Sequence, residues 1–205
     1  GTLTVNKIDT ENQEKLKEAE FTLYNEKGEQ VGEPQVSNED GIAEFKGLAW
    51  GKYEVKETKA PQGYQLDAEA KPVTIGQKET AVSITVENSR ILGALTVTKV
   101  DADNDDAPLA GAEFTLYKDG EPVGEPQVTG EDGTVTFADL EWGEYEIAET
   151  AAPEGYQLVT EKEVIVVGAE KTEHQVTIAN VKIKADLIVE KTDAETGEDL
   201  AGAVF

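Results

Sequence analysis

An internal repeat with a period of 92 residues is the feature that most constrains the fold of this chain. The segment GTLTVNKID at 1–9 recurs as GALTVTKVD at 93–101 and as ADLIVEKTD at 185–193. Longer runs recur in the same order, including AEFTLY and G-x-Y-E-[VI]-x-E-T-x-A-P-x-G-Y-Q-L. Self-similarity at a fixed spacing indicates one supersecondary unit that is repeated along the chain. The sequence therefore predicts one repeat at 1–92, a second at 93–184, and the first strand or strands of a truncated third repeat at 185–205.

Each repeat has the pattern of an all-β domain. Stretches rich in Val, Ile, Thr and Tyr alternate apolar and polar residues between turn signals, and no helical period is sustained. Seven short strands in a repeat of about 92 residues predict an Ig-like β-sandwich with one modest core. The short interval between repeats predicts that the two sandwiches stack as a stiff rod. In the first repeat, the strands are expected near 2–9, 20–25, 30–37, 42–46, 51–58, 71–75 and 80–88.

The charge and composition of the chain exclude several classes of function. Eighteen Lys and Arg against 43 Asp and Glu give a net charge of −25, which argues against binding to nucleic acid or to an anionic membrane surface. No apolar run is long enough to cross a bilayer, and no signal peptide opens the chain. The sequence has no Cys and a single His, His174, which excludes disulfides, Cys nucleophiles and multi-histidine metal sites. We therefore expect no cofactor, no metal and no conventional turnover enzyme.

Two local signals have simple interpretations. The acidic run from Asp101 to Asp106 suggests a calcium loop, but it lacks the required glycine, and Glu113 falls one position too late. A solvated turn is the favoured interpretation. In the second repeat, Lys118-Asp119-Gly120 predicts a hairpin turn in which Lys118 is solvated.

Strand periodicity places three polar side chains on the apolar side of each repeat. In the first repeat, Lys7, Glu57 and Asn88 each follow two apolar residues on one face of a strand, because residues two apart share a face. An isolated buried charge is very costly, so these groups must satisfy one another or become neutral. The second repeat has the same pattern at Lys99, Glu149 and Asn180.

Two interpretations of these residues are open. In the first, Lys and Glu form a buried ion pair, and Asn completes the hydrogen bonds. In the second, burial favours the neutral forms, so that the amine is a nucleophile and the protonated carboxyl can donate a hydrogen bond to the Asn carbonyl and relay protons. Amine and amide held in contact react with an effective molarity of roughly 10⁵–10⁸ M. The product would be a Lys–Asn isopeptide bond, with loss of ammonia.

The motifs together resemble a known family. The order K-x-D, then L-A-G-A-E-F-T-L-Y at 109–117, then G-x-Y-x-[VI]-x-E-T-x-A-P-x-G-Y, then a last strand ending in Asn is similar to the Cna B-type domain. This domain is also called SpaA-like or prealbumin-like, and it occurs in surface adhesins and pilins of Gram-positive bacteria. The first repeat departs from the pattern at 15–19, where KLKEA replaces the usual L-A-G-A, and Trp50 and Trp142 replace a common Pro.

The resemblance implies specific bonds. In this family, the Lys of the first strand joins the Asn of the last strand, with the Glu of the E-T-x-A-P segment as the catalyst. Carried over to this sequence, Lys7 bonds to Asn88 with Glu57 assisting, and Lys99 bonds to Asn180 with Glu149 assisting.

The resemblance also implies a structural role. The repeats would be stalk segments of a secreted, cell-wall-anchored surface protein of a Gram-positive bacterium, in contact with adjacent repeats of the same polypeptide. A distal head domain would bind a host extracellular protein, and this segment would contact neither nucleic acid nor membrane. The alternatives are an adhesive module that itself binds a host protein, for example by strand addition, or a segment of a backbone pilin.

Overall fold

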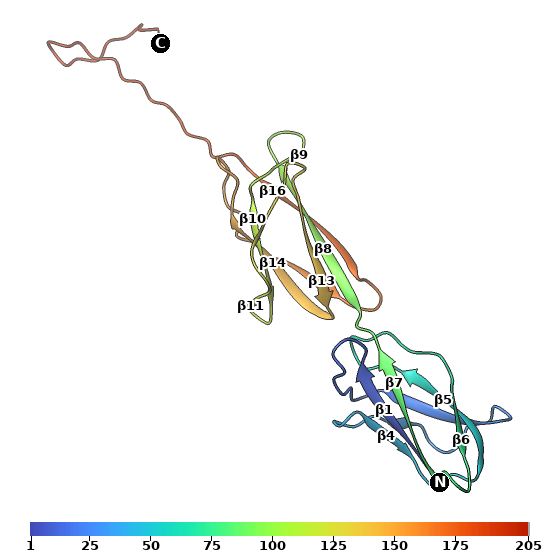
Figure 1. Cartoon of the computed structure of the whole chain (residues 1–205). Coiled ribbons are helices and arrows are strands. Elements are labelled where there is room, and N and C mark those ends of the chain that lie inside the picture. Colours follow the sequence, from blue (N-terminus) through green and yellow to red (C-terminus); the bar gives the residue numbers. More distant parts are fainter. Residues whose placement is uncertain (205) are drawn as a thin grey trace.

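Alternating apolar residues fold each repeat into two β-sheets that share one core, and the two repeats, called unit one and unit two, lie end to end (Figure 1). The computed structural model describes residues 1–204, which form strands, turns and loops. This part of the chain contains no helix that could span a membrane. The prediction of tandem all-β sandwich domains is confirmed.

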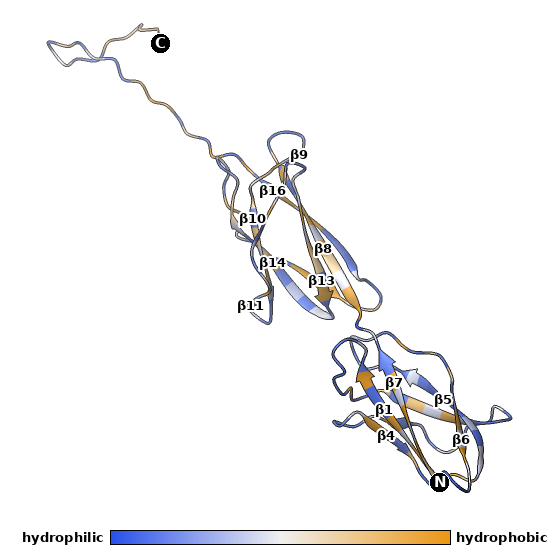
Figure 2. Cartoon of the chain, viewed as in Figure 1, coloured by the Kyte–Doolittle hydropathy of each residue, from blue (hydrophilic) through white to orange (hydrophobic). Residues whose placement is uncertain are grey.

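Unit one has a three-stranded sheet in the order β4-β1-β7 and a four-stranded sheet in the order β3-β2-β5-β6. Figure 2 shows apolar and polar residues alternating along its strands, as a half-buried sheet requires. The buried apolar residues of the two sheets meet in a single core. The strands are β1 (Thr2–Asp9), β2 (Glu20–Asn25), β3 (Gln35–Val36), β4 (Ile42–Phe45), β5 (Gly51–Lys59), β6 (Lys71–Ile75) and β7 (Ala81–Asn88).

Unit two repeats this arrangement with sheets in the orders β13-β8-β16 and β11-β10-β14-β15. β12 pairs with β10 as β3 pairs with β2 in unit one, and two short strands are added, where β9 pairs with β8 and β11 pairs with β10. The strands are β8 (Leu92–Asp101), β9 (Ala107–Pro108), β10 (Glu113–Lys118), β11 (Glu121–Pro122), β12 (Gln127–Val128), β13 (Thr134–Glu141), β14 (Gly143–Ala151), β15 (Glu163–Val167) and β16 (Glu173–Asn180).

The first and last strands of each unit are parallel neighbours. β1 pairs with β7 over eight residue pairs from Thr2↔Ala81 to Asp9↔Asn88, and β8 pairs with β16 in the same way. Parallel strands end at the same edge of a sheet, so the ends of β1 and β7 come together although they are far apart in sequence. This pairing positions the candidate site.

Two local expectations were wrong. The strand expected at 30–37 is reduced to β3 and a single bridge at Gln30, because Gly32 has a φ of 71° and Pro34 has no N–H to donate. Lys118 is not solvated as expected: its ammonium donates to the Trp142 carbonyl at 2.9 Å and lies 5.0 Å from the centre of the Tyr145 ring.

The linker between the units is three residues long, since β7 ends at Asn88 and β8 begins at Leu92. It is held against the turn that follows β5: Gln65 N donates to Ser89 O at 2.9 Å, and Ile91 N donates to Gly63 O at 2.8 Å. Short, hydrogen-bonded connections leave little freedom for bending. The end-to-end arrangement in Figure 1 is therefore built into the linker.

Residues 185–204 extend away from unit two without forming a strand (Figure 1). Leu187 is 87% exposed and Ile188 is 81% exposed. In unit one the equivalent strand, β1, pairs with β4 and β7, and in unit two β8 pairs with β13 and β16. Residues 185–204 contain no counterpart of these partner strands. Their assignment to a third repeat stays a prediction from the sequence.

Candidate functional site

The candidate site of unit one lies between its two sheets, at the end where β1 and β7 stop. Lys7 comes from β1, Asn88 from β7 and Glu57 from β5 of the other sheet. All three are buried, and Lys7 is 0% exposed. Strand periodicity explains the placement, because each residue continues the buried face of its strand.

The Glu57 carboxylate lies between the amine and the amide of this site. Lys7 Nζ is 3.6 Å from Glu57 Oε1, and Asn88 Nδ2 donates to Glu57 Oε2 at 2.9 Å. The backbone N–H of Asp67 also donates to Glu57 Oε2, at 2.8 Å, and fixes the carboxylate. Lys7 Nζ donates to the Val86 carbonyl at 3.2 Å. One carboxylate thus contacts both polar side chains and can pass a proton between them.

Unit two repeats the arrangement with the amine and the amide in direct contact. Lys99 Nζ is 3.5 Å from Glu149 Oε1 and donates to both Ile178 O, at 3.0 Å, and Asn180 Oδ1. Asn180 Nδ2 donates to Glu149 Oε1 at 2.9 Å. The backbone N–H of Val159 holds the other carboxylate oxygen at 2.7 Å. Both repeats therefore bring the same three residue types together.

The electrostatics favour a reactive amine. Burial lowers the pKa of Lys7 below its usual value, although the negative charge of Glu57 opposes this shift. The pKa of Lys99 is lowered for the same reason, with Glu149 opposing. A lowered pKa increases the fraction of neutral amine, which is the nucleophilic form.

The hydrogen bond between Glu and Asn runs in the opposite direction to the one considered from the sequence: the Asn amide donates and the Glu carboxylate accepts. In unit one, Asn88 Nδ2 donates both to Glu57 and to the backbone carbonyl of Gln65. A carbonyl can only accept, so it holds the amide nitrogen, rather than the amide oxygen, on the side of the carboxylate. The carboxylate therefore lies beside the nitrogen that would leave as ammonia.

A second buried network, which sequence analysis did not single out, lies next to this site. Asp9 is 0% exposed and accepts hydrogen bonds from the Tyr64 hydroxyl at 2.9 Å and Arg90 Nε at 2.8 Å. The backbone N–H of Glu11 donates to it at 2.7 Å. Burial acts to raise the pKa of Asp9, but these hydrogen bonds outweigh it and hold the pKa at about 2. The sequence does contain a signal for the burial of Asp9, because Asp9 lies two residues after Lys7 and therefore on the same buried face of the strand.

In unit two, Asp101 has the equivalent role. Its carboxylate accepts from Tyr156 at 2.8 Å and lies 3.0 Å from Lys182 Nζ. The first acid of the calcium-like run is thus committed to two protein side chains. Within residues 1–204, no cluster of three or more His, Asp or Glu side chains is arranged to hold a metal ion.

Replacing Asp9 by Asn should destabilise unit one by about 1–3 kcal/mol at pH 7, since Arg90 and Tyr64 lose a charged acceptor. The folded pKa of about 2 lies below the ordinary value of 3.8 for an aspartate, so this stabilisation is present above about pH 4 and is lost as the pH falls toward 2. Thermal unfolding at both pH values measures the effect. Asp40→Asn, at a carboxylate that is 71% exposed, is the matched control and should change little. An Asp9→Asn loss that is equally large at pH 2 would contradict this assignment.

Both the sequence and the structure are similar to those of known proteins. The family model described as SpaA, a prealbumin-like fold domain, matches residues 1–90 and 93–182. No curated protein sequence matches the chain. The structure of the Bacillus anthracis TIE protein is similar, with 32% identity over 89% of this chain and a TM-score of 0.81. This chain spans only 34% of the length of that one.

A second similar structure is the C-terminal fragment of the pilus adhesin SpaC from Lactobacillus rhamnosus GG. It has 19% identity, covers 91% of this chain and 99% of its own, and gives a TM-score of 0.60. At this identity the likeness shows a shared fold.

Proposed function

The chain belongs to the SpaA family of prealbumin-like fold domains, and we propose that each unit closes an intramolecular isopeptide bond. The bonds join Lys7 to Asn88 and Lys99 to Asn180. Glu57 and Glu149 transfer the proton. The observation that carries the proposal is that, in both units, one buried carboxylate contacts both the amine and the amide.

The geometry supports condensation of the Lys amine with the Asn amide, with loss of ammonia. The neutral Lys amine attacks Cγ of Asn, a C–N bond forms, and the Cγ–Nδ2 bond breaks. One proton moves from Nζ to Nδ2 by way of the Glu carboxylate, which lies beside both nitrogens, and ammonia leaves. The contact between Lys99 and the Asn180 side chain supplies the proximity that this step needs. Each bond forms once and consumes its own side chains, so the protein is not a turnover enzyme.

The role of the bonds is mechanical and protective. The units form a stalk of a cell-wall-anchored surface protein of a Gram-positive bacterium, and the cross-links let the stalk resist tension and proteases without cysteine. The rod-like arrangement and the net charge of −25 suit a soluble spacer. Partners are the adjacent repeats, and a distal head binds the host. The adhesive module and the backbone pilin segment stay alternative predictions from the sequence.

Intact mass spectrometry tests the central claim. The denatured chain should be lighter than its sequence mass by two molecules of ammonia, one for each unit. Peptide mapping should then recover Lys7 linked to Asn88, and Lys99 linked to Asn180. A mass equal to the sequence mass would leave the buried Lys–Glu ion pair as the correct interpretation.

Replacing Glu57 by Gln should abolish the bond in unit one and leave unit two cross-linked. Gln keeps the size and hydrogen-bonding capacity of the side chain but cannot take a proton from Lys7. The mass should therefore show the loss of one ammonia instead of two. Glu54→Gln is the matched control, because Glu54 lies on the exposed face of the same strand, and this variant should keep both bonds. A complete Lys7–Asn88 bond in Glu57→Gln would remove the proton-transfer role.

A further inference from the structure

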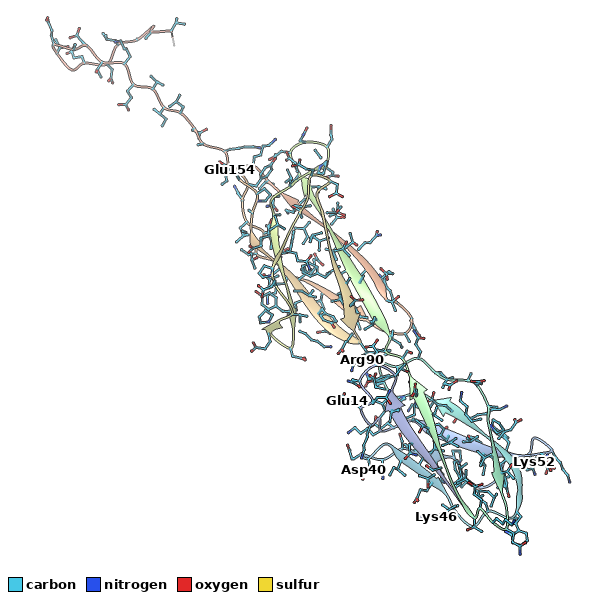
Figure 3. The ribbon with its side chains drawn as sticks, viewed as in Figure 1. Glu14, Asp40, Lys46, Lys52, Arg90 and Glu154 are labelled. Carbon is cyan, nitrogen blue, oxygen red and sulfur yellow. The ribbon has the colours of Figure 1, made fainter. Side chains whose placement is uncertain are left out.

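The junction between the units is built around one tryptophan. A Cβ placed on Gly63 would lie 3.2 Å from Trp142 Cβ, so the turn of unit one approaches the start of β14 closely. The far edge of the Trp142 ring lies 3.8 Å from a Cβ placed on Gly168 of unit two. Trp142 is therefore enclosed between a turn of unit one and a turn of its own unit, and it is only partly exposed. Arg90, which Figure 3 labels where the two units meet, donates from Nε to Asp9 in unit one and from Nη1 to Glu141 in unit two.

The tryptophan at the equivalent position of unit one has no such cover. Trp50 is 64% exposed. Gly76, the equivalent of Gly168, has no atom within 4 Å of the position of its Cβ. Trp50 instead lines a shallow hollow with the hairpin residues Asn25, Glu26 and Lys27. Unit one thus carries an open copy of the surface that Trp142 uses.

The opposite end of unit two carries an open copy of the turn. Ile183 N donates to Gly155 O at 2.8 Å, as Ile91 N donates to Gly63 O at 2.8 Å in the junction. The φ of Gly155 is 86° and that of Gly63 is 87°, so the two turns have the same backbone form. Gly155 is exposed and has nothing within 4 Å. Figure 3 places the neighbouring Glu154 at the end of unit two that lies away from unit one.

We propose that the Trp50 face is a docking site for a turn of the Gly63 and Gly155 type, carried by another repeat of this kind that is joined head to tail with unit one in the same polypeptide. The chain then presents a complementary surface at each end, with the contact between Gly63 and Trp142 as its template. The proposal extends the stalk function proposed above, because it adds the joint that would carry a regular shaft across successive segments.

Charge indicates that this contact needs a continuous chain. Ala49 occupies the position of Glu141, and Lys182 occupies that of Arg90, so the ion pair of the existing junction has no counterpart in the new one. Two free chains of net charge −25 also repel each other. Covalent linkage raises the effective concentration of the two surfaces and offsets both effects.

The test is a tandem chain in which residues 1–184 are followed directly by residues 1–205, which keeps the repeat spacing. Phe replaces every Trp except Trp50 of the second copy, and the reference is the 205-residue chain with Trp142→Phe. Acrylamide should quench the fluorescence of this Trp50 roughly twofold more weakly in the tandem chain than in the reference chain. The reason is that the docked turn would shield the Trp50 ring as the existing junction shields Trp142. An equal quenching constant in the two chains would overturn the proposal.

A second pair of variants identifies what covers Trp50. Gly155→Asn in the first copy places a side chain on the turn while tolerating its positive φ, and it should restore the quenching of the reference chain. Gly120→Asn, at a hairpin turn with a φ of 83° and nothing within 4 Å, should leave the protection unchanged. Protection that survives Gly155→Asn would overturn the assignment of the turn. Quenching does not depend on the isopeptide bonds and intact mass does not depend on docking, so the two proposals fail separately.

Discussion

Replacing Lys99 by Met should lower the midpoint of thermal unfolding of unit two by about 20 °C or more, while unit one unfolds as before. A bond between Lys99 and Asn180 closes a loop of 81 residues. On the chain-entropy account used for disulfides, such a closure stabilises the fold by roughly 4–5 kcal/mol. Met keeps most of the aliphatic stem, so the core of unit two stays filled, but the nucleophile is gone. Calorimetry resolves the two units, and unit one is the internal reference.

The control for this variant is Lys171→Met. Lys171 is exposed in the turn between β15 and β16, where a substitution usually changes stability by no more than about 0.5 kcal/mol. Intact mass assigns the cause, because Lys99→Met should also recover the mass of one ammonia. A large loss of stability in a chain that never lost ammonia would instead identify a broken ion pair between Lys99 and Glu149. Equal midpoints for the two variants would contradict both interpretations.

The site residues follow from local sequence because strand periodicity is a strong rule. Lys7, Glu57 and Asn88 each continue a run of apolar residues at a spacing of two, and the structure buries all three. Their mutual contacts do not follow from periodicity. They depend on the parallel pairing of β1 with β7 and on the packing of β5 across the sandwich, which are long-range features of the fold. Before the structure, the cost of an isolated buried charge indicated that these groups satisfy one another, and the resemblance to a family assigned them to one site.

The burial of Asp9 also follows from strand periodicity, although it was not predicted. Asp9 continues the buried face by one more step, but it lies at the end of a strand, where a carboxylate usually reaches water. Its partners Tyr64 and Arg90 come from a turn and from the linker, whose positions no periodic pattern predicts. The contact between Trp142 and Gly63 also does not follow from any periodic pattern, because Gly63 belongs to the other unit.

Stretching single molecules should show no unfolding of either unit in the native chain, and full unfolding of unit one in Asn88→Ala. Load enters unit one through the start of β1 and leaves through the end of β7. A bond from Lys7 to Asn88 carries that load directly from the first strand to the last. Residues 8–87 are then outside the loaded path and cannot extend.

Without the bond, tension must be carried by the hydrogen bonds between β1 and β7, which break in shear. The 80 residues between Lys7 and Asn88 would then add about 260–290 Å of length. Unit two keeps its own bond in this variant and should stay closed, so each molecule should give one such step and no second one. The matched control is Asn38→Ala at an exposed turn, which should give no step. A native chain that extends by two steps of this size would show that load does not pass through covalent bonds at these positions.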